Sequence, residues 1–185
     1  MSGYDALILA GGRASRLGGR DKPGMVVGGM PMIERVAGAA SGADRLVVVG
    51  PARPGLNHAI LLQEDPPGGG PVPALRAGLA EVTAPWVVLL AADLPLLAAG
   101  HVSALLEAAG EFGGAGAVLV DDTGRMQWLA GAWRTAVLAE ALDGYRGRSL
   151  HGLLGPLDPV PVHLAGEPWF DCDTLDDLEH VRSRR

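Results

Sequence analysis

The stretch LILAGGRASRLGGRDKP, residues 7–23, decides how the rest of the chain is interpreted. The apolar residues 6–10 run directly into a loop that holds four glycines and three arginines and closes with an Asp-Lys pair. Glycine lets backbone N–H groups approach a phosphate closely, and arginine and lysine supply positive charge. The stretch therefore predicts a buried strand followed by a loop that binds a polyphosphate.

Two common phosphate-binding motifs do not fit this loop. Walker A requires G-x-x-x-x-G-K-[ST], whereas Lys22 follows Asp21 and precedes Pro23. The glycines at 11, 12, 18 and 19 do not form the G-x-G-x-x-G pattern of dinucleotide-binding folds either. The remaining alternative is an ordinary surface turn. The apolar strand before the loop and the four cations within the loop argue against it.

The rest of the sequence alternates short apolar runs with segments whose apolar residues recur at helical spacing. This pattern predicts an α/β fold, a three-layer α/β/α sandwich around a mostly parallel, Rossmann-like sheet. The predicted strands are Ala6–Ala10, Arg45–Gly50, Ala59–Leu62, Trp86–Ala91, Gly116–Val120 and Val160–His163. The predicted helix faces are Ile33/Val36/Ala37/Ala40, Leu75/Gly78/Leu79/Val82 and Val102/Leu105/Leu106/Ala109.

The segment DTLDDLEHVRSRR, residues 173–185, predicts a C-terminal helix. Thr174 stands at its N-cap and Asp177 at the capping-box position, with Leu175, Leu178 and Val181 facing inward. Two glycine- and proline-rich segments, residues 50–55 and 64–73, follow predicted strands. Loops at the carboxyl ends of parallel strands form the ligand crevice of open α/β sheets, so both are candidate parts of a site.

Size and composition limit the possible functions. A chain of 185 residues and 19.0 kDa fits a single domain, residues 1–185. A net charge of −6 and a pI of about 5.3 argue against nucleic acid as a partner. Without an apolar run of spanning length or a basic leader, we expect a cytoplasmic protein with no membrane partner. The single cysteine, Cys172, is expected to be structural.

The opening stretch resembles a known signature. LAGGRASRLGGRDK, residues 9–22, is similar to L-A-G-G-x-S-x-R-M-G-x-D-K of the molybdenum cofactor guanylyltransferase (MobA-like) family of nucleotidyltransferases. Further segments resemble that family in chain order: EDPPGGGPVPALRAGL (64–79), VVLLAADLPLL (87–97), QWLAGAWR (127–134), GRSLHGLL (147–154) and FDCDTLDDL (170–178). The resemblance implies the nucleotide-diphospho-sugar transferase type of fold, with a nucleotide-binding half near 1–100 and an acceptor-binding half near 101–185.

The resemblance also implies an activity: Mg²⁺-dependent transfer of GMP from GTP to the terminal phosphate of molybdopterin, with release of pyrophosphate. Lys22 is expected to neutralise the triphosphate and Asp93, at the end of a buried strand, to bind Mg²⁺. Arg16 joins them as a catalytic candidate, although it and Arg20 could equally point to solvent. The remaining nucleotide-binding candidates are Leu9, Ala10, Gly11, Gly12, Arg13, Asp65 and Gly70.

Within that set, the residues have different expected contacts. Leu9, Ala10 and Gly11 would contact the nucleotide through their backbone, and Gly12 and Arg13 would lie close to the phosphates. Asp65 is expected in the base and ribose region, where a carboxylate suits the N–H donors of guanine, although it could instead cap a turn. The loop that contains Gly70 would pass beside the base.

Acceptor contacts are expected in the second half of the chain. The candidates are Gln127, Arg125, Arg146, Arg148 and Asp173. The arginines on either side of Gly147 could instead be a solvated surface pair. Trp128 and Trp133 are expected in the core, and the five histidines are scattered without a catalytic pattern.

The L-A-G-G form of the first loop favours GTP over CTP, because cytidylyl relatives tend toward L-A-A-G. Several positions depart from the family pattern: Gly50 (often Asn), Ala74 (often Gly), Asp173 (often Asn), and Gly24 and Met25 after the Asp-Lys pair. They bear on base choice and acceptor identity.

Two alternatives stay open: a relative that uses CTP or another phosphorylated acceptor, and a non-catalytic nucleotide-binding relative. Other proteins of cofactor biosynthesis and molybdoenzyme chaperones are further candidate partners.

Overall fold

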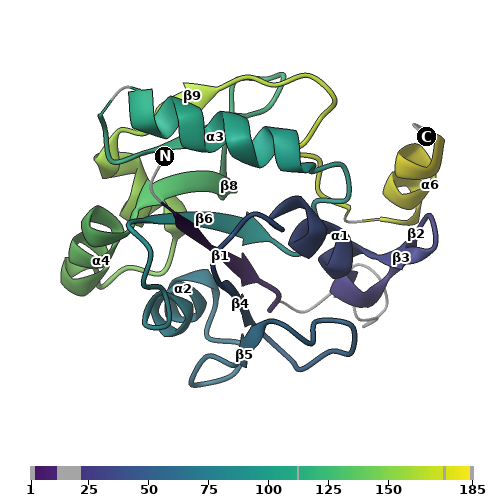
Figure 1. The fold of residues 1–185 in the computed structure, drawn as a ribbon, viewed down its shortest axis with the longest axis horizontal. Coiled ribbons are helices and arrows are strands. Elements are labelled where there is room, and N and C mark those ends of the chain that lie inside the picture. The colour runs from purple at the N-terminus through teal and green to yellow at the C-terminus, as the bar shows by residue number, and fades with distance from the viewer. Residues whose placement is uncertain (1–2, 12–21, 112, 173, 184–185) are drawn as a thin grey trace.

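A seven-stranded sheet forms the centre of the computed structural model, which describes residues 3–11, 22–111, 113–172 and 174–183 (Figure 1). Its strands are β1 (Tyr4–Leu9), β4 (Leu46–Val49), β5 (Ile60–Leu62), β6 (Trp86–Ala91), β7 (Gly116–Val120), β8 (Met126–Arg134) and β9 (Val160–Val162). The strand order is β5-β4-β1-β6-β8-β7-β9, and every neighbouring pair is parallel except the two that involve β8. The predicted mostly parallel α/β sheet is confirmed.

Helices cover both faces of this sheet. They are α1 (Met32–Ala39), α2 (Pro71–Leu79), α3 (Ala99–Glu111), α4 (Thr135–Gly144), α5 (Leu150–Leu154) and α6 (Leu175–Ser183), with short 3-10 turns η2 (Lys22–Gly24) and η3 (Gly155–Leu157). A small hairpin, β2 (Val26–Val27) and β3 (Met30–Pro31), precedes α1. Within the described ranges, no helix is both long and apolar enough to cross a bilayer.

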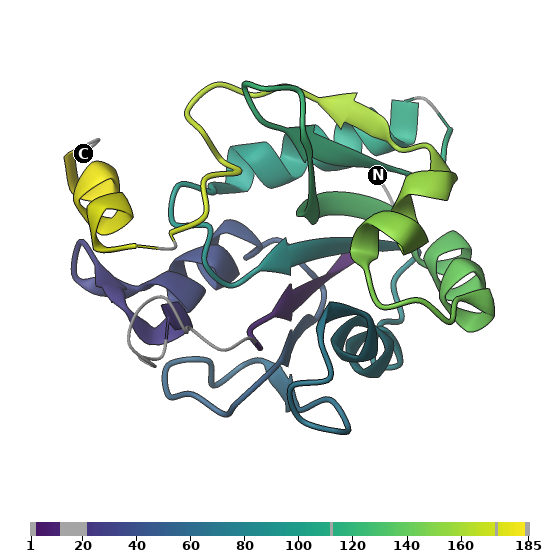
Figure 2. The ribbon, with the colours of Figure 1, turned by 180° about the vertical axis from the view of Figure 1, so that it is seen from behind.

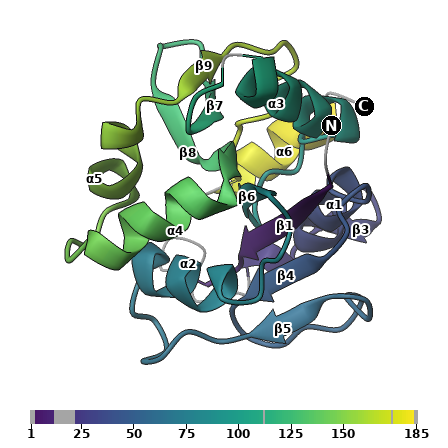
Figure 3. The same ribbon diagram turned by 60° about the vertical axis from the view of Figure 1, so that its left-hand side comes forward.

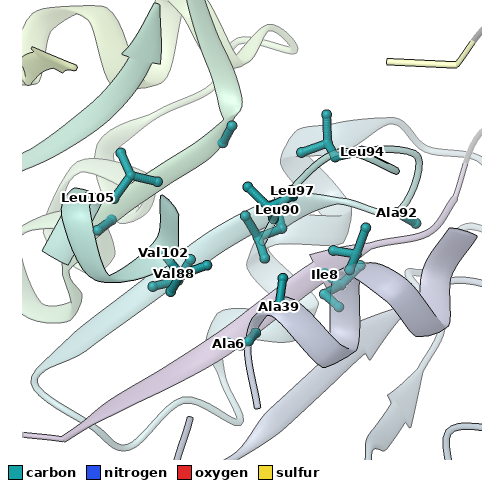
Figure 4. Close-up of a cluster of buried hydrophobic side chains, with 14 of the residues drawn as sticks. Ala6, Ile8, Ala39, Val88, Leu90, Ala92, Leu94, Leu97, Val102 and Leu105 are labelled. Atoms are coloured by element: carbon teal, nitrogen blue, oxygen red, sulfur yellow. The ribbon is translucent and has the colours of Figure 1, made fainter. Parts of the chain in front are cut away.

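Two buried clusters show that the sheet is covered on both sides. One cluster packs α1 and α3 against one face, where side chains of β1, β6 and both helices interlock (Figure 4). The other packs α2, α4 and α5 against the opposite face, and Figure 3 shows α2 and α4 across the sheet from α3. The alternation of side chains along each strand divides the apolar residues between these two faces. The predicted three layers are therefore confirmed.

A third buried cluster fixes the C-terminus. Val27, Met32, Cys172 and Val181 pack together, which joins the β2–β3 hairpin, α1 and α6. Helix α6 lies beside this hairpin in Figures 1 and 2. Cys172 is buried within the cluster, in agreement with a structural role.

The predicted capping box of α6 is present. The Thr174 backbone N–H donates to Asp177 Oδ2 at 2.6 Å, and the Asp177 backbone N–H donates to Thr174 Oγ1 at 3.2 Å. These reciprocal bonds satisfy backbone donors that the first helical turn leaves unpaired. The capping box that the sequence predicts at Thr174 and Asp177 therefore stabilises the start of α6.

Sequence patterning missed strand β8, the β2–β3 hairpin, α4 and α5. Strand β8 contains alanines and a glycine, which have low strand propensity, and it is antiparallel to both neighbours. Trp133 is fully buried, as expected, whereas Trp128 is half-buried and packs edge-on against His151 of α5, with ring centroids 5.5 Å apart. The hairpin strands have two residues each, too short to show a period.

Asp5 is a buried carboxylate at the amino end of β1 that holds the start of β6 in place. Its Oδ2 accepts hydrogen bonds from the backbone N–H groups of Thr83 and Ala84, at 2.7 and 3.0 Å. Both donors would be left without this acceptor if the side chain were removed. The carboxylate therefore supports the alignment of β1 with β6.

We expect Asp5→Ala to lower the free energy of unfolding by about 2–4 kcal/mol, because two backbone donors lose their acceptor. Chemical denaturation measures the change. Asp122→Ala is the matched control, since Asp122 is exposed in a turn. Equal stability of the two variants would contradict this role of Asp5.

Candidate active site

Three parallel strands end side by side at one edge of the sheet. Leu9 is paired with Val49 and with Ala91, so β1, β4 and β6 end at the same level. Hydrogen bonds carry both ladders one residue further, from Ala10 N–H to the Val49 carbonyl at 2.7 Å and from Ala92 N–H to the Leu9 carbonyl at 3.2 Å. This carboxyl edge is where α/β sheets of this kind bind ligands.

Lys22 and Asp93 form an ion pair across this edge. Asp93 follows β6, and Lys22 begins the 3-10 turn η2, so the pair joins segments 71 residues apart. Their side chains are 14% and 21% exposed, which leaves both charges accessible from one side. The structure therefore brings together the two residues that the sequence predicted as the triphosphate and metal ligands.

The C-terminal segment packs beside Asp93. The Cys172 backbone N–H donates to the Asp93 carbonyl at 3.2 Å. Burial raises the pKa of the Cys172 thiol to about 11, aided by the negative charges of Asp177, Asp93 and Asp171 and opposed by Lys22. These groups lie close enough to interact, so the segment before α6 forms one wall of the ion-pair site.

Glu64 is a buried carboxylate between the two glycine-rich loops. It is 5% exposed, and its Oε1 accepts the Gly68 backbone N–H at 2.9 Å. A Cβ placed on Gly11 would lie 3.4 Å from the same Oε1, so the carboxylate is directly beside the first loop. Its neighbour Asp65, the carboxylate that the sequence motif predicts as the base contact, is exposed.

Gly50 packs against the backbone of the first loop. It has φ +151°, and a Cβ at this position would lie 2.7 Å from the Ala10 carbonyl carbon and 2.9 Å from Gly11 N. The departure from Asn that the sequence shows here therefore has a structural reason. Gly50 allows the loop after β4 to support the nucleotide-binding backbone predicted at residues 9–11.

A cavity of about 600 Å³ lies on the flank of α2 and is bordered by three arginines, Arg76, Arg146 and Arg148. Asp65 and Gly69 line its other side. Arg76 and Arg146 donate to backbone carbonyls at the end of α4. Arg148 is exposed and has no hydrogen bond or ion pair with another described residue. We call this cavity the arginine pocket.

Two other predicted acceptor residues lie elsewhere. Arg125 is in the turn between β7 and β8, and Gln127 is at the start of β8. Asp121 accepts the Arg125 backbone N–H at 3.0 Å and Gln127 Nε2–H at 2.8 Å. Its pKa is lowered, first by the hydrogen bond from the Thr123 hydroxyl. Leu90 pairs with Ala130 in antiparallel register, so the start of β8 lies at the same edge of the sheet as the end of β6. Neither Gln127 nor Arg125 lines the arginine pocket.

Several predicted site residues lie outside the described part of the chain: Gly12, Arg13, Arg16, Arg20 and Asp173. Leu9 and Ala10 are buried at the end of β1, and Gly11 is exposed beside Glu64. Gly70 precedes α2 with φ 102°, a conformation that favours glycine. The ligand contacts of all these residues remain predictions.

The described residues hold no group of three or more His, Cys, Asp or Glu side chains arranged for a metal ion. Mg²⁺ commonly binds proteins through only one or two carboxylates and takes its other ligands from phosphates and water. Asp93 is a partly exposed carboxylate beside a cation that can neutralise phosphate. Its chemistry therefore fits a magnesium ion shared with a nucleotide.

The sequence pattern of one family, described as the MobA-like NTP transferase domain, matches residues 6–160. The chain belongs to this family. It is therefore a nucleotidyltransferase, and the matched region includes the ion pair, both glycine-rich loops and the arginine pocket.

Named relatives and solved structures agree with this membership. A "Probable molybdenum cofactor guanylyltransferase" of Nostoc sp. is 33% identical over 98% of this chain and 92% of the relative. The structure of molybdopterin-guanine dinucleotide biosynthesis protein A from Archaeoglobus fulgidus has a TM-score of 0.76 at 20% identity, with 97% of each chain covered. A 2-C-methyl-D-erythritol 4-phosphate cytidylyltransferase from Thermus thermophilus has a TM-score of 0.72 at 21% identity, with 98% of each covered. The two structures show a shared fold.

We expect Gly50→Ala to lower the free energy of unfolding by about 1–3 kcal/mol, because the new methyl group would overlap the Ala10–Gly11 backbone. Chemical denaturation measures the loss. Gly38→Ala is the control, since a Cβ at Gly38 would meet nothing within 4 Å. A Gly50→Ala protein as stable as this control would rule out the proposed packing role.

Proposed function

We propose that this chain transfers GMP from GTP to the terminal phosphate of molybdopterin. An acceptor phosphate oxygen attacks the α-phosphorus of GTP, a new P–O–P linkage forms, and the bond to the β-phosphate breaks to release pyrophosphate. The names of the relatives, including a molybdenum cofactor guanylyltransferase of Nostoc sp., support this choice of substrates. The single structural observation that carries the proposal is the Lys22–Asp93 ion pair at the carboxyl edge of the sheet.

Each half of the ion pair has a partner in this reaction. Lys22 exchanges Asp93 for the triphosphate and stabilises the negative charge that grows on the leaving pyrophosphate. Asp93 would hold Mg²⁺, which would neutralise the phosphates when bound. The acceptor phosphate is already ionised at neutral pH and needs no general base. Positioning and charge neutralisation therefore supply the catalysis.

GTP is the proposed donor. The first loop has the L-A-G-G form expected of guanylyl enzymes, and the buried Glu64 carboxylate beside Gly11 offers only acceptors to a base. The fold is compatible with cytidylyl transfer as well, since a cytidylyltransferase shares it. The choice between the two bases therefore depends on side chains in the loops.

Acceptor binding is proposed for two places at the carboxyl edge. Arg148 borders the arginine pocket with a guanidinium that no described residue engages, which suits a phosphate. Gln127 lies at the start of β8, at the same edge of the sheet as Asp93, and has its amide oriented by Asp121. Cytoplasmic action on small molecules, without nucleic acid or a membrane, is part of the same proposal.

Pyrophosphate release tests the function. The purified protein with Mg²⁺ is given each nucleoside triphosphate in turn, with and without molybdopterin. Turnover that requires both GTP and molybdopterin supports the proposal. Preference for CTP would replace it by the cytidylyl alternative, and binding of nucleotide without any turnover would favour a non-catalytic relative.

We expect Asp93→Ala to abolish pyrophosphate release at every Mg²⁺ concentration, because the metal loses its protein carboxylate and Lys22 loses its partner. Steady-state rates across a Mg²⁺ titration measure this. Asp122→Ala, in the exposed turn after β7, serves as the control and should keep the wild-type rate. Near-normal turnover by Asp93→Ala would remove Asp93 from the metal site.

We expect Arg148→Ala to raise the KM for molybdopterin about tenfold while the KM for GTP stays unchanged, because a charge-assisted bond to the acceptor is lost. Initial rates with each substrate varied separately measure the two constants. Arg45→Ala, an exposed arginine at the opposite edge of the sheet, is the comparison. If the GTP constant alone changes, Arg148 binds the nucleotide instead.

A further inference from the structure

We infer that Glu64 is the residue that selects guanine, with its carboxylate accepting N1–H and N2–H of the base. This inference rests on the proposed use of GTP and names the side chain that enforces it. The sequence motif predicts the base contact at Asp65, the neighbouring carboxylate. The burial, position and unused hydrogen-bonding capacity of Glu64 point to it instead.

Glu64 and Asp5 are the buried carboxylates among the described residues, and of the two only Glu64 lies at the carboxyl edge of the sheet. It is 5% exposed, whereas Asp65 is exposed. Burying a carboxylate is costly unless hydrogen bonds or opposite charges compensate it. Among the described residues, its one hydrogen bond is from Gly68 N–H to Oε1, and Oε2 accepts none. Oε2 is not among the fully enclosed side-chain atoms that lack a partner, so it can be reached from outside and can accept a donor from a ligand.

Its position matches the place where a base would lie. The carboxylate is beside Gly11, which belongs to the backbone segment expected to contact the nucleotide, and it is bonded to Gly68 of the second glycine-rich loop. A planar base held between Gly11 and Gly68 would present its edge to Glu64. Gly50, in the loop after β4, has no side chain and so offers no polar side-chain group to the base at its own position.

The chemistry of a carboxylate favours guanine. A carboxylate at neutral pH only accepts hydrogen bonds. The Watson–Crick edge of guanine has two adjacent donors, N1–H and N2–H, whereas adenine and cytosine place an unprotonated ring nitrogen beside their amino group. That nitrogen would face the carboxylate as a second acceptor. Glu64 thus attracts the correct base and repels the wrong ones.

Asp65 is poorly placed for the same contact. It lines the arginine pocket with Arg76, Arg146 and Arg148, on the flank of α2. Its charge is therefore available to those arginines. The two adjacent carboxylates therefore have different surroundings.

Inosine triphosphate is the sharpest probe, because it lacks only the N2 amino group of guanine. We expect the wild-type protein to prefer GTP to ITP in kcat/KM by about 10–100-fold, and E64Q to lose most of this preference because its amide replaces one acceptor by a donor. D65N and Q63A, with exposed side chains on the same segment, should keep the preference. A purely structural defect would lower both rates and leave their ratio unchanged.

The results separate this inference from the proposed function. An unchanged GTP:ITP ratio in E64Q, or a ratio that collapses in D65N, overturns the role of Glu64. If the wild type releases no pyrophosphate from GTP, the proposed function fails, and equilibrium binding of GTP and ITP to wild type and E64Q still tests the inference by the same ratio. If E64Q does not fold, E64D replaces it, because Asp withdraws the carboxylate by one methylene. The inference then requires that E64D lowers the GTP:ITP ratio.

Discussion

The Lys22–Asp93 ion pair is the interaction on which the organisation of this site depends. Its members come from the end of the first loop and from the end of β6, so it exists only if β1 and β6 are adjacent and in register. The register pairs Leu9 with Ala91, which places the residues that follow each strand at the same edge. The core, by fixing two strands at its centre, thus places two opposite charges side by side at the carboxyl edge, where we propose that the triphosphate and the metal bind.

The main strands and the three layers of the fold were predictable from sequence because they depend on local apolar patterns. Predicted strands Trp86–Ala91 and Gly116–Val120 coincide with β6 and β7, and all four residues of the predicted Val102–Ala109 face are buried. Strand β8 was not predictable in this way, since a glycine and alanines hide its period. Its place between β6 and β7 depends on pairing across the sheet, which local propensity does not encode.

The candidate site shows the same division. Lys22 and Asp93 stand out in the sequence because each belongs to a distinctive motif, and the structure brings them together. Glu64 does not stand out beside Asp65, because which of two adjacent carboxylates is buried depends on the path of the loop after β5. Gly50 likewise appears in the sequence as a departure from the family pattern, whereas its contact with the Ala10–Gly11 backbone explains the departure. Tertiary packing determines these two roles, and no local signal carries them.

Lys22 has a further property that follows from composition: it is the one lysine in the 185-residue sequence, where every other Lys or Arg position is arginine. Apart from the α-amino terminus, the chain therefore has a single primary amine, and this amine lies in the ion pair at the carboxyl edge of the sheet. Arginine is always charged and resists acylation, whereas a lysine amine can be acylated or carbamylated and then loses its charge. Amine-directed chemistry on this protein, whether metabolic or applied as a reagent, is thereby concentrated on the group that we propose binds the triphosphate.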